Sequence, residues 1–211
     1  MFYWPLFGLR IRTERLELRL PTDPDLFELV AVALAGVHDP AQMPFLEPWT
    51  QTPSPGFERG FLQYHWSTRA NWRPESWQLE LGVWAEGRAA GAQAISAGGF
   101  AEHRSVSTGS WLGLPFQGRG YGKEMRSAVL AFAFEHLGAE MVTTSAFTDN
   151  AASIAVSRSL GYEETGVEHV ETQGQLREAI GFLMTRDLWQ ARERPVVLVE
   201  GLEECREFFG V

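Results

Sequence analysis

The residues best suited to chemistry lie in a glycine-rich stretch, Gly118 to Lys123, which joins an expected strand to an expected helix. Glycines at alternate positions let the backbone approach an anion closely, because they carry no Cβ atom. The free N–H groups of the first helical turn and the helix dipole also favour negative charge there. Arg119, Lys123 and Arg126 add positive side chains to the same region. This pattern indicates pyrophosphate binding.

Other interpretations of the glycine-rich stretch fit its spacing less well. A dinucleotide-binding fingerprint needs glycines spaced GxGxxG in an early βαβ unit, whereas the glycines here alternate and come late. A P-loop ends in Gly-Lys-Ser or Gly-Lys-Thr, and Gly122-Lys123-Glu124 does not. A tight strand–helix turn without a ligand stays open as the structural alternative, and a nucleotide-binding domain stays as the weakest functional one.

A second motif follows further along the chain. Asn150-Ala151-Ala152-Ser153 is expected to start a helix, and Leu160-Gly161-Tyr162 to end it. Together with Gln117, Gly120 and Gly122, this motif resembles the GCN5-related N-acetyltransferase superfamily (GNAT). Within that superfamily, the sequence is most similar to the branch that acetylates the N-termini of ribosomal proteins.

The resemblance covers roughly residues 9–190 and implies a fold, a co-substrate and a set of contacts. The implied fold is α+β, with a central mixed, mostly antiparallel twisted sheet of about seven strands, flanked by helices and containing a splayed parallel strand pair. Residues 1–192 would form one acyltransferase domain, with 193–211 as a C-terminal appendage of it. The co-substrate is acyl-CoA, with acetyl-CoA and succinyl-CoA both open as donors. The implied acyl-CoA contacts are Trp111, Leu112, Gly113, Gln117, Gly118, Arg119, Gly120, Tyr121, Gly122, Lys123, Asn150 and Ser153.

Acyl transfer to an amine leaves a CoA thiolate, which needs a proton. Many GNAT members carry a tyrosine seven residues after the asparagine of the second motif, and that position is Ser157 here. The resemblance therefore makes Ser153 the candidate general acid. A local hydrogen bond in the first helical turn is the alternative role for this serine.

The acceptor amine needs a base, and the usual residue for this role is also missing. The related branch often has a glutamate on its donor strand, at the position of Ser107. Glu80 and Glu102 are the candidate bases, because the strand pattern places them on or beside the central strands. His103 and a water relay are the other candidates, and a solvated surface position is the ordinary alternative for each carboxylate.

Two tryptophans are candidates for the acceptor side. Trp49 lies in the proline-rich segment 38–56, and Trp66 lies in the helix expected after it. Core packing is the ordinary role of tryptophan and is the alternative for both. A succinyl group would also need a cation near its carboxylate, and the candidates for it are Arg69, Arg73 and Arg88.

Alternating and helical hydrophobic periods predict the elements that position these residues. Strands are expected over residues 16–20, 77–84, 90–95, 105–112, 141–147, 162–171 and 179–184. Helices are expected over residues 26–34, 57–68, 120–137 and 150–160, and the proline-rich segment is expected to be irregular. In the tail, Val196 to Val199 is an apolar extended segment. It could pair with another subunit or cover the edge of its own sheet.

The overall composition restricts the partners. The 211 residues include 18 Lys+Arg and 27 Asp+Glu, so the net charge is −9. That balance argues against nucleic acid and anionic membranes as partners. The one cysteine, Cys205, leaves no intramolecular disulfide. We therefore expect a reducing, cytoplasmic location and no metal cofactor.

The function best supported by these observations is an acyl-CoA-dependent N-acyltransferase whose acceptor is an amine of a protein or a small molecule. Excess negative charge would attract a cationic acceptor. A homo-oligomer is expected. Since the tyrosine and the donor-strand glutamate are both absent, a non-catalytic acyl-CoA sensor with the same fold is the alternative.

Overall fold

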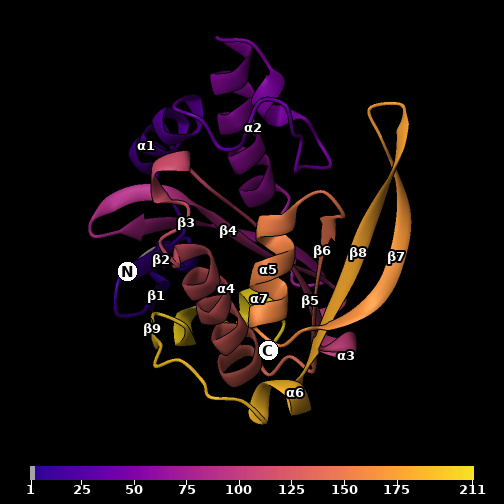
Figure 1. Ribbon diagram of the computed structural model, residues 1–211. Helices are drawn as coiled ribbons and strands as arrows, with labels where there is room; N and C mark the ends of the chain where they lie inside the picture. Colours follow the sequence, from indigo (N-terminus) through magenta and orange to yellow (C-terminus); the bar gives the residue numbers. More distant parts are fainter. Residues whose placement is uncertain (1–2) are drawn as a thin grey trace.

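A single twisted sheet organises the computed structural model, which describes residues 3–211 (Figure 1). Over this range the sheet has nine strands in the order β7-β8-β6-β5-β4-β3-β2-β1-β9. The pairing of β5 with β6 is parallel, and the other neighbouring pairs are antiparallel. The predicted α+β fold is confirmed. The sheet has two strands more than expected, because the short strands β1 and β9 extend one edge.

Seven of the nine observed strands overlap the strands predicted from sequence. The nine strands are β1 (Arg10–Arg12), β2 (Leu16–Arg19), β3 (Ser76–Ala85), β4 (Arg88–Gly98), β5 (Ser105–Leu112), β6 (Met141–Phe147), β7 (Glu163–Thr172), β8 (Gln175–Thr185) and β9 (Leu198–Glu200). Strand β8 starts earlier than predicted, since its first residues belong to an exposed hairpin arm and carry no apolar alternation.

Seven α-helices are described. They are α1 (Asp23–Leu34), α2 (Gly56–Ala70), α3 (Phe100–His103), α4 (Tyr121–Ala131), α5 (Ala151–Ser159), α6 (Arg186–Gln190) and α7 (Arg206–Phe209). Three of them, α1, α5 and α6, begin at a side-chain cap. Thr22 and Asp25 form a reciprocal capping box at the start of α1, which satisfies two N–H groups left free by the helix. Helix α4 continues as a π-helical segment over Phe132–Leu137.

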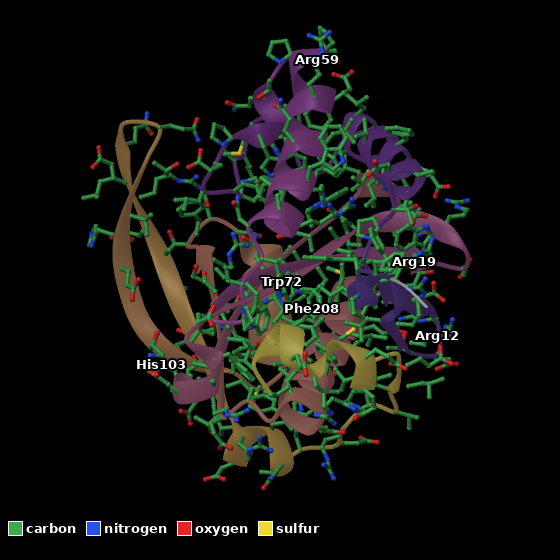
Figure 2. The ribbon with its side chains drawn as sticks, turned by 180° about the vertical axis from the view of Figure 1, so that it is seen from behind. Arg12, Arg19, Arg59, Trp72, His103 and Phe208 are labelled. Atoms are coloured by element: carbon green, nitrogen blue, oxygen red, sulfur yellow. The ribbon has the colours of Figure 1, made fainter. Side chains whose placement is uncertain are left out.

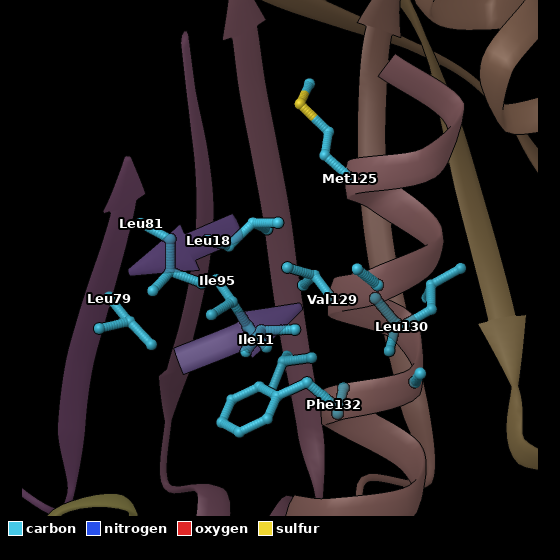
Figure 3. Close-up of a cluster of buried hydrophobic side chains, with 14 of the residues drawn as sticks. Ile11, Leu18, Leu79, Leu81, Ile95, Met125, Val129, Leu130 and Phe132 are labelled. Carbon is cyan, nitrogen blue, oxygen red and sulfur yellow. The ribbon is translucent and has the colours of Figure 1, made fainter. Parts of the chain in front are cut away.

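The main core lies between the sheet and α4 (Figure 3). Met125, Val129 and Phe132 recur at helical spacing and are buried, so they form one apolar face of this helix. The strand side chains that meet this face include Ile11, Leu18, Leu79, Leu81 and Ile95. Helix α4 is thereby held against the sheet, and its first turn lies at the end of β5.

The parallel strands β5 and β6 stay paired only at their beginnings. Their register ends at Ser107 opposite Thr143, and just beyond it the Thr144 hydroxyl donates to the Thr108 carbonyl oxygen at 2.9 Å. Strand β5 then continues to Leu112 beside β4 alone. The segment 109–112 therefore has one unpaired edge, where the resemblance predicts the splay.

The C-terminal tail folds back onto its own protomer. Strand β9 pairs antiparallel with β1, with Val199 opposite Ile11. The Trp72 indole N–H donates to the Phe208 carbonyl oxygen at 2.8 Å, and the two residues lie side by side (Figure 2). Of the two roles open for the extended tail segment, covering the protomer's own sheet edge is the one observed.

Within residues 3–211, no helix combines the length and the apolar character that crossing a bilayer requires.

Candidate active site

The loop between β5 and α4 offers free backbone N–H groups. Gly118 and Gly120 have φ angles of 71° and 84°, a conformation that glycine adopts without steric cost. Gly120 is the N-cap of α4, and no described side chain caps the first turn. Free amides together with the helix dipole favour an anion at this position.

Gln117 holds the base of this loop. Its Nε2 donates to the carbonyl oxygen of Leu112 at 2.8 Å and to that of Val37 at 2.6 Å. The Gly113 N–H donates to the Ala90 carbonyl oxygen at 2.9 Å. These bonds join the end of β5 to β4 and to the segment after α1. The three predicted contact residues Leu112, Gly113 and Gln117 therefore lie together beneath the loop.

Positive charge at the loop comes from partly different residues than predicted. Arg119 and Lys123 are exposed there, but Arg126, expected beside them, is buried. Arg15 lies at the loop instead: one of its Nη atoms donates to the Arg119 carbonyl oxygen at 3.1 Å, and its guanidinium lies 4.8 Å from the centre of the Tyr121 ring. Its charge is balanced by Glu124 of α4, to which its Nε donates at 2.8 Å, so Arg119 and Lys123 are the exposed cations of the loop. No local pattern could have revealed Arg15, because it lies more than a hundred positions before the loop.

The second motif forms the start of α5 as predicted. Asn150 is the N-cap, and its side-chain oxygen accepts a hydrogen bond from the Ser153 N–H at 3.1 Å. Ser153 is half-buried. Ser157 lies one turn further along the helix and is fully buried, where its hydroxyl accepts a bond from Arg126 at 3.0 Å. The two serines occupy the same face of α5 because they are four residues apart.

A cavity of about 770 Å³ opens on the face of the sheet that α2 covers. Its floor is a row of side chains from four successive strands: Gln78, Ser96, Ser107 and Thr143 are register partners. Ser67 and Thr68 of α2 and its C-cap residue Asn71 line its wall. The described residues that line it include no Lys, Arg, Asp or Glu. The cavity is therefore polar and largely uncharged, and it reaches the point where β5 and β6 separate.

Glu80 lies directly behind this cavity. It is buried, and its Oε1 accepts hydrogen bonds from the Tyr64 hydroxyl at 2.6 Å and from the Gln78 amide at 2.5 Å. Both donors line the cavity. Glu80 pairs with Ala94, which pairs with Gly109, so Glu80 stands two strands from the unpaired segment of β5, about 10 Å away.

Burial controls the proton affinity of this group of residues. Burial raises the pKa of the Glu80 carboxyl, and the hydrogen bonds from Tyr64 and Gln78 offset part of that effect. Burial also raises the pKa of the Tyr64 hydroxyl, and the neighbouring Glu80 carboxylate raises it further. The adjacent His65 packs on Phe61, and burial lowers its pKa to about 4. His65 is therefore neutral at pH 7, and Glu80 is the ionisable acid of this cluster.

The remaining predicted residues lie in different places. Trp49 packs against Trp111 with ring centres 5.6 Å apart, on the same face as the cavity. Trp66 is exposed and its indole N–H donates to Asp23 at 3.1 Å, and it does not line the cavity. Glu102 is exposed on α3 and does not line the cavity either. His103, beside it, does.

Tyr64 and Gln78 are candidate site residues that sequence reasoning missed. Tyr64 follows the apolar helical period of α2, and Gln78 follows the alternation of β3, so each reads as an ordinary structural position. Their significance depends on contact with Glu80, which joins a helix to a strand. Within residues 3–211, no group of three or more His, Cys, Asp or Glu side chains could hold a metal ion.

Comparison with known families identifies the fold and its general chemistry. The acetyltransferase (GNAT) domain family matches residues 15–163, which is more than half of the chain. The chain belongs to this family. The matched range includes both GNAT motifs, Glu80 and its partners.

Individual relatives agree with this assignment. An uncharacterised N-acetyltransferase, YokL, from the SPβ prophage of Bacillus subtilis is 35% identical over 75 residues, which make up 35% of this chain and 42% of that protein. The chain thus spans less than half of that relative in the match. RimJ of Mycobacterium smegmatis with CoA-disulfide superposes with a TM-score of 0.70 at 19% identity, covering 89% of this chain and 88% of that one. RimL, a ribosomal L7/L12 α-N-protein acetyltransferase in complex with coenzyme A, superposes with a TM-score of 0.66 at 17% identity. The superposition covers 83% of this chain and 97% of that one.

Proposed function

We propose that this GNAT protein transfers an acetyl group from acetyl-CoA directly to an amine. One observation carries the proposal. The unpaired edge of β5 lies between the amide-rich loop at α4 and the polar cavity beneath α2, and Glu80 stands behind that cavity. A thioester along this edge could be reached by an amine in the cavity. Family membership supports acyl-CoA as the donor.

The pyrophosphate of the donor would contact the free N–H groups of the loop and the side chains of Arg119 and Lys123. Its pantetheine arm would lie along the segment 109–112, whose backbone N–H and C=O groups face the splay. Asn150 and Ser153 would flank it from the start of α5. Two observations support these assignments: no described side chain caps the N-terminus of α4, and segment 109–112 of β5 has no pairing with β6.

The Gly118→Ala variant tests the loop assignment. A side chain at φ 71° costs about 1–2 kcal/mol of backbone strain, although a Cβ atom there would meet no neighbour within 4 Å. Relief of that strain rotates the loop amides, so we expect the Kd for CoA to rise about tenfold in calorimetry. Gly174→Ala is the matched control, because Gly174 has φ 69° and equally open space at the β7–β8 turn. Equal CoA affinity in the two variants would contradict the loop site.

The transfer itself would proceed by direct attack. The amine nitrogen forms a bond to the thioester carbonyl carbon, the C–S bond breaks, and its electron pair leaves on sulfur as the CoA thiolate. Backbone N–H groups of segment 109–112 would polarise the carbonyl. Glu80 would receive the proton from the amine through Tyr64 or a water molecule. Ser153 would relay a proton from a water molecule to the thiolate, so that its own hydroxyl is restored and hydroxide is left to solvent.

The surroundings of the cavity favour acetyl over succinyl as the transferred group. A carboxylate buried without a cation costs several kcal/mol, and no described lining residue is a lysine or an arginine. Arg69 is bound to Asp23 and to the Pro21 carbonyl. Arg73 bonds backbone carbonyls beside it, and Arg88 lies over the Phe116 ring.

The decisive experiment measures acceptor-dependent thiol release from acetyl-CoA and from succinyl-CoA. We expect kcat/KM to favour acetyl-CoA by about 10²-fold. The acceptor panel should include a polyamine and a peptide with a free N-terminus, since RimL acts on a protein α-amine. Binding of acetyl-CoA without release by any amine would support the sensor alternative. A preference for succinyl-CoA would refute the donor assignment.

A further inference from the structure

One charged side chain near the splay has no counter-ion in the part of the chain that the structure describes. Arg126 lies on α4 and is only 4% exposed. Its Nη1 donates to the Ser157 hydroxyl at 3.0 Å and its Nη2 to the Ser110 hydroxyl at 3.2 Å. Its buried Nε has no hydrogen-bond partner among the described residues. Among residues 3–211, no carboxylate lies within ion-pair distance of this guanidinium.

This arrangement is energetically unusual. An arginine stays protonated inside proteins, and an unpaired buried charge is strongly unfavourable. Burial lowers the pKa of Arg126, and the facing titratable group that opposes this effect is the Tyr162 hydroxyl. Ser110 on β5 and Ser157 on α5 are neutral. An anion that entered this neighbourhood would therefore gain more from Arg126 than it would from an arginine already paired.

The position of Arg126 indicates which anion that is. Ser110 belongs to the segment of β5 that has no β6 partner. Ser157 lies on the face of α5 that also carries Ser153. The guanidinium thus connects β5, on one side of the splay, with α5, which flanks the other side. Under the proposed function, the sulfur of CoA lies between these two elements.

We propose that Arg126 is a positioning residue that stabilises the CoA thiolate during acyl transfer, an inference that rests on the proposed function. When the amine nitrogen bonds to the carbonyl carbon, the C–S electron pair moves onto sulfur and creates a negative charge. Arg126 acts on that charge through its field and through the Ser110 and Ser157 hydroxyls, which it orients. Ser153 or water then supplies the proton. Such fixed charge lowers a barrier most when water is excluded.

The test measures the pKa of the thiol in enzyme-bound CoA by following the ultraviolet absorbance of the thiolate. In the wild-type complex we expect this pKa to lie at least one unit below that of free CoA measured in the same buffer. In Arg126→Met, which removes the charge and keeps an apolar side chain in its place, it should return to that value. The kcat should fall about 10- to 100-fold. Arg126→Lys, which keeps the charge, should recover part of both effects.

Desulfo-CoA, which lacks the thiol sulfur, is the control ligand. Arg126→Met should bind it with wild-type affinity, while its CoA affinity at high pH should fall. Equal weakening for both ligands would mean a structural role and would overturn the inference. An ordinary thiol pKa in the wild-type complex would overturn it too, whether or not the variants fold. Failure of the wild type to bind acetyl-CoA would instead refute the proposed function.

Discussion

Replacing Glu80 by glutamine is expected to lower the kcat for amine acetylation by about 10²-fold or more. Glutamine keeps the shape of the side chain and can still accept the 2.6 Å hydrogen bond from the Tyr64 hydroxyl, but it cannot take a proton from the acceptor. The KM for acetyl-CoA should stay within about threefold, because the loop at α4 is untouched. Initial-rate measurements with saturating amine separate the two parameters.

Glu102→Gln is the matched control for Glu80→Gln. Glu102 is exposed on α3 and does not line the cavity, so its removal should leave kcat unchanged. Tyr64→Phe should give an intermediate loss, since it removes the hydroxyl that connects Glu80 to the cavity. If Glu80→Gln keeps wild-type kcat, Glu80 is not the base, and a water relay or His103 becomes the better hypothesis.

Titration of Glu80 in the wild-type protein makes the free energy of unfolding depend on pH, with a defined sign. Burial raises the pKa of Glu80 in the folded protein, so the folded state holds this proton at pH values where the unfolded state has lost it. The free energy of unfolding therefore decreases as pH rises from the unfolded pKa, about 4.3, through the raised folded pKa. Wild-type activity should rise over the upper part of this range, because the base must be ionised.

Glu80→Gln removes this titration. Its thermal stability should therefore exceed that of the wild type above the folded pKa and approach it at acid pH. A variant that is less active yet more stable at neutral pH would show that the carboxylate is kept for its chemistry. Equal stability curves for the two proteins would contradict a raised pKa.

The parts of the candidate site that were predictable from sequence are those encoded over short distances along the chain. The glycine loop and the Asn150 cap each depend on a few consecutive residues, and both form as expected. Elements with strong apolar periods were predictable for the same reason. Strand β1 was missed because three residues are too short to show a period.

The rest of the candidate site depends on contacts between segments that lie far apart in the sequence. Glu80 becomes a candidate base through Tyr64, which reaches it from a helix on the covered face of the sheet. Arg126 reads as a surface cation beside a basic loop, but the helical period turns it inward against Ser110 and Ser157. A charged residue on a helix carries no local sign of burial, so only the packed structure distinguishes a buried arginine from one on the surface.

Phe209→Ala is expected to lower the free energy of unfolding by about 3–5 kcal/mol. Phe209 is fully buried near the end of the tail. Its ring meets those of Trp72, Trp77 and Phe132 with centres 5.6, 5.0 and 5.8 Å apart. Truncation to alanine leaves a void among three large rings, which belong to the segment just after α2, to β3 and to the π-helical continuation of α4. These elements cannot all move to close it. Urea unfolding curves measure the change through their midpoint at constant slope.

Val196→Ala is the control within the same tail, because Val196 is 93% exposed and its loss should change stability by less than about 0.5 kcal/mol. The comparison tests the proposal that residues 193–211 belong to the acyltransferase domain. The Trp77 ring packs against Phe209 in the core, away from the loop at α4, so Phe209→Ala should leave the affinity for CoA unchanged. A single cooperative transition at lower urea would agree with one domain. An unchanged main transition, with a separate early one for the tail, would show instead that the appendage folds independently of the sheet that carries the site.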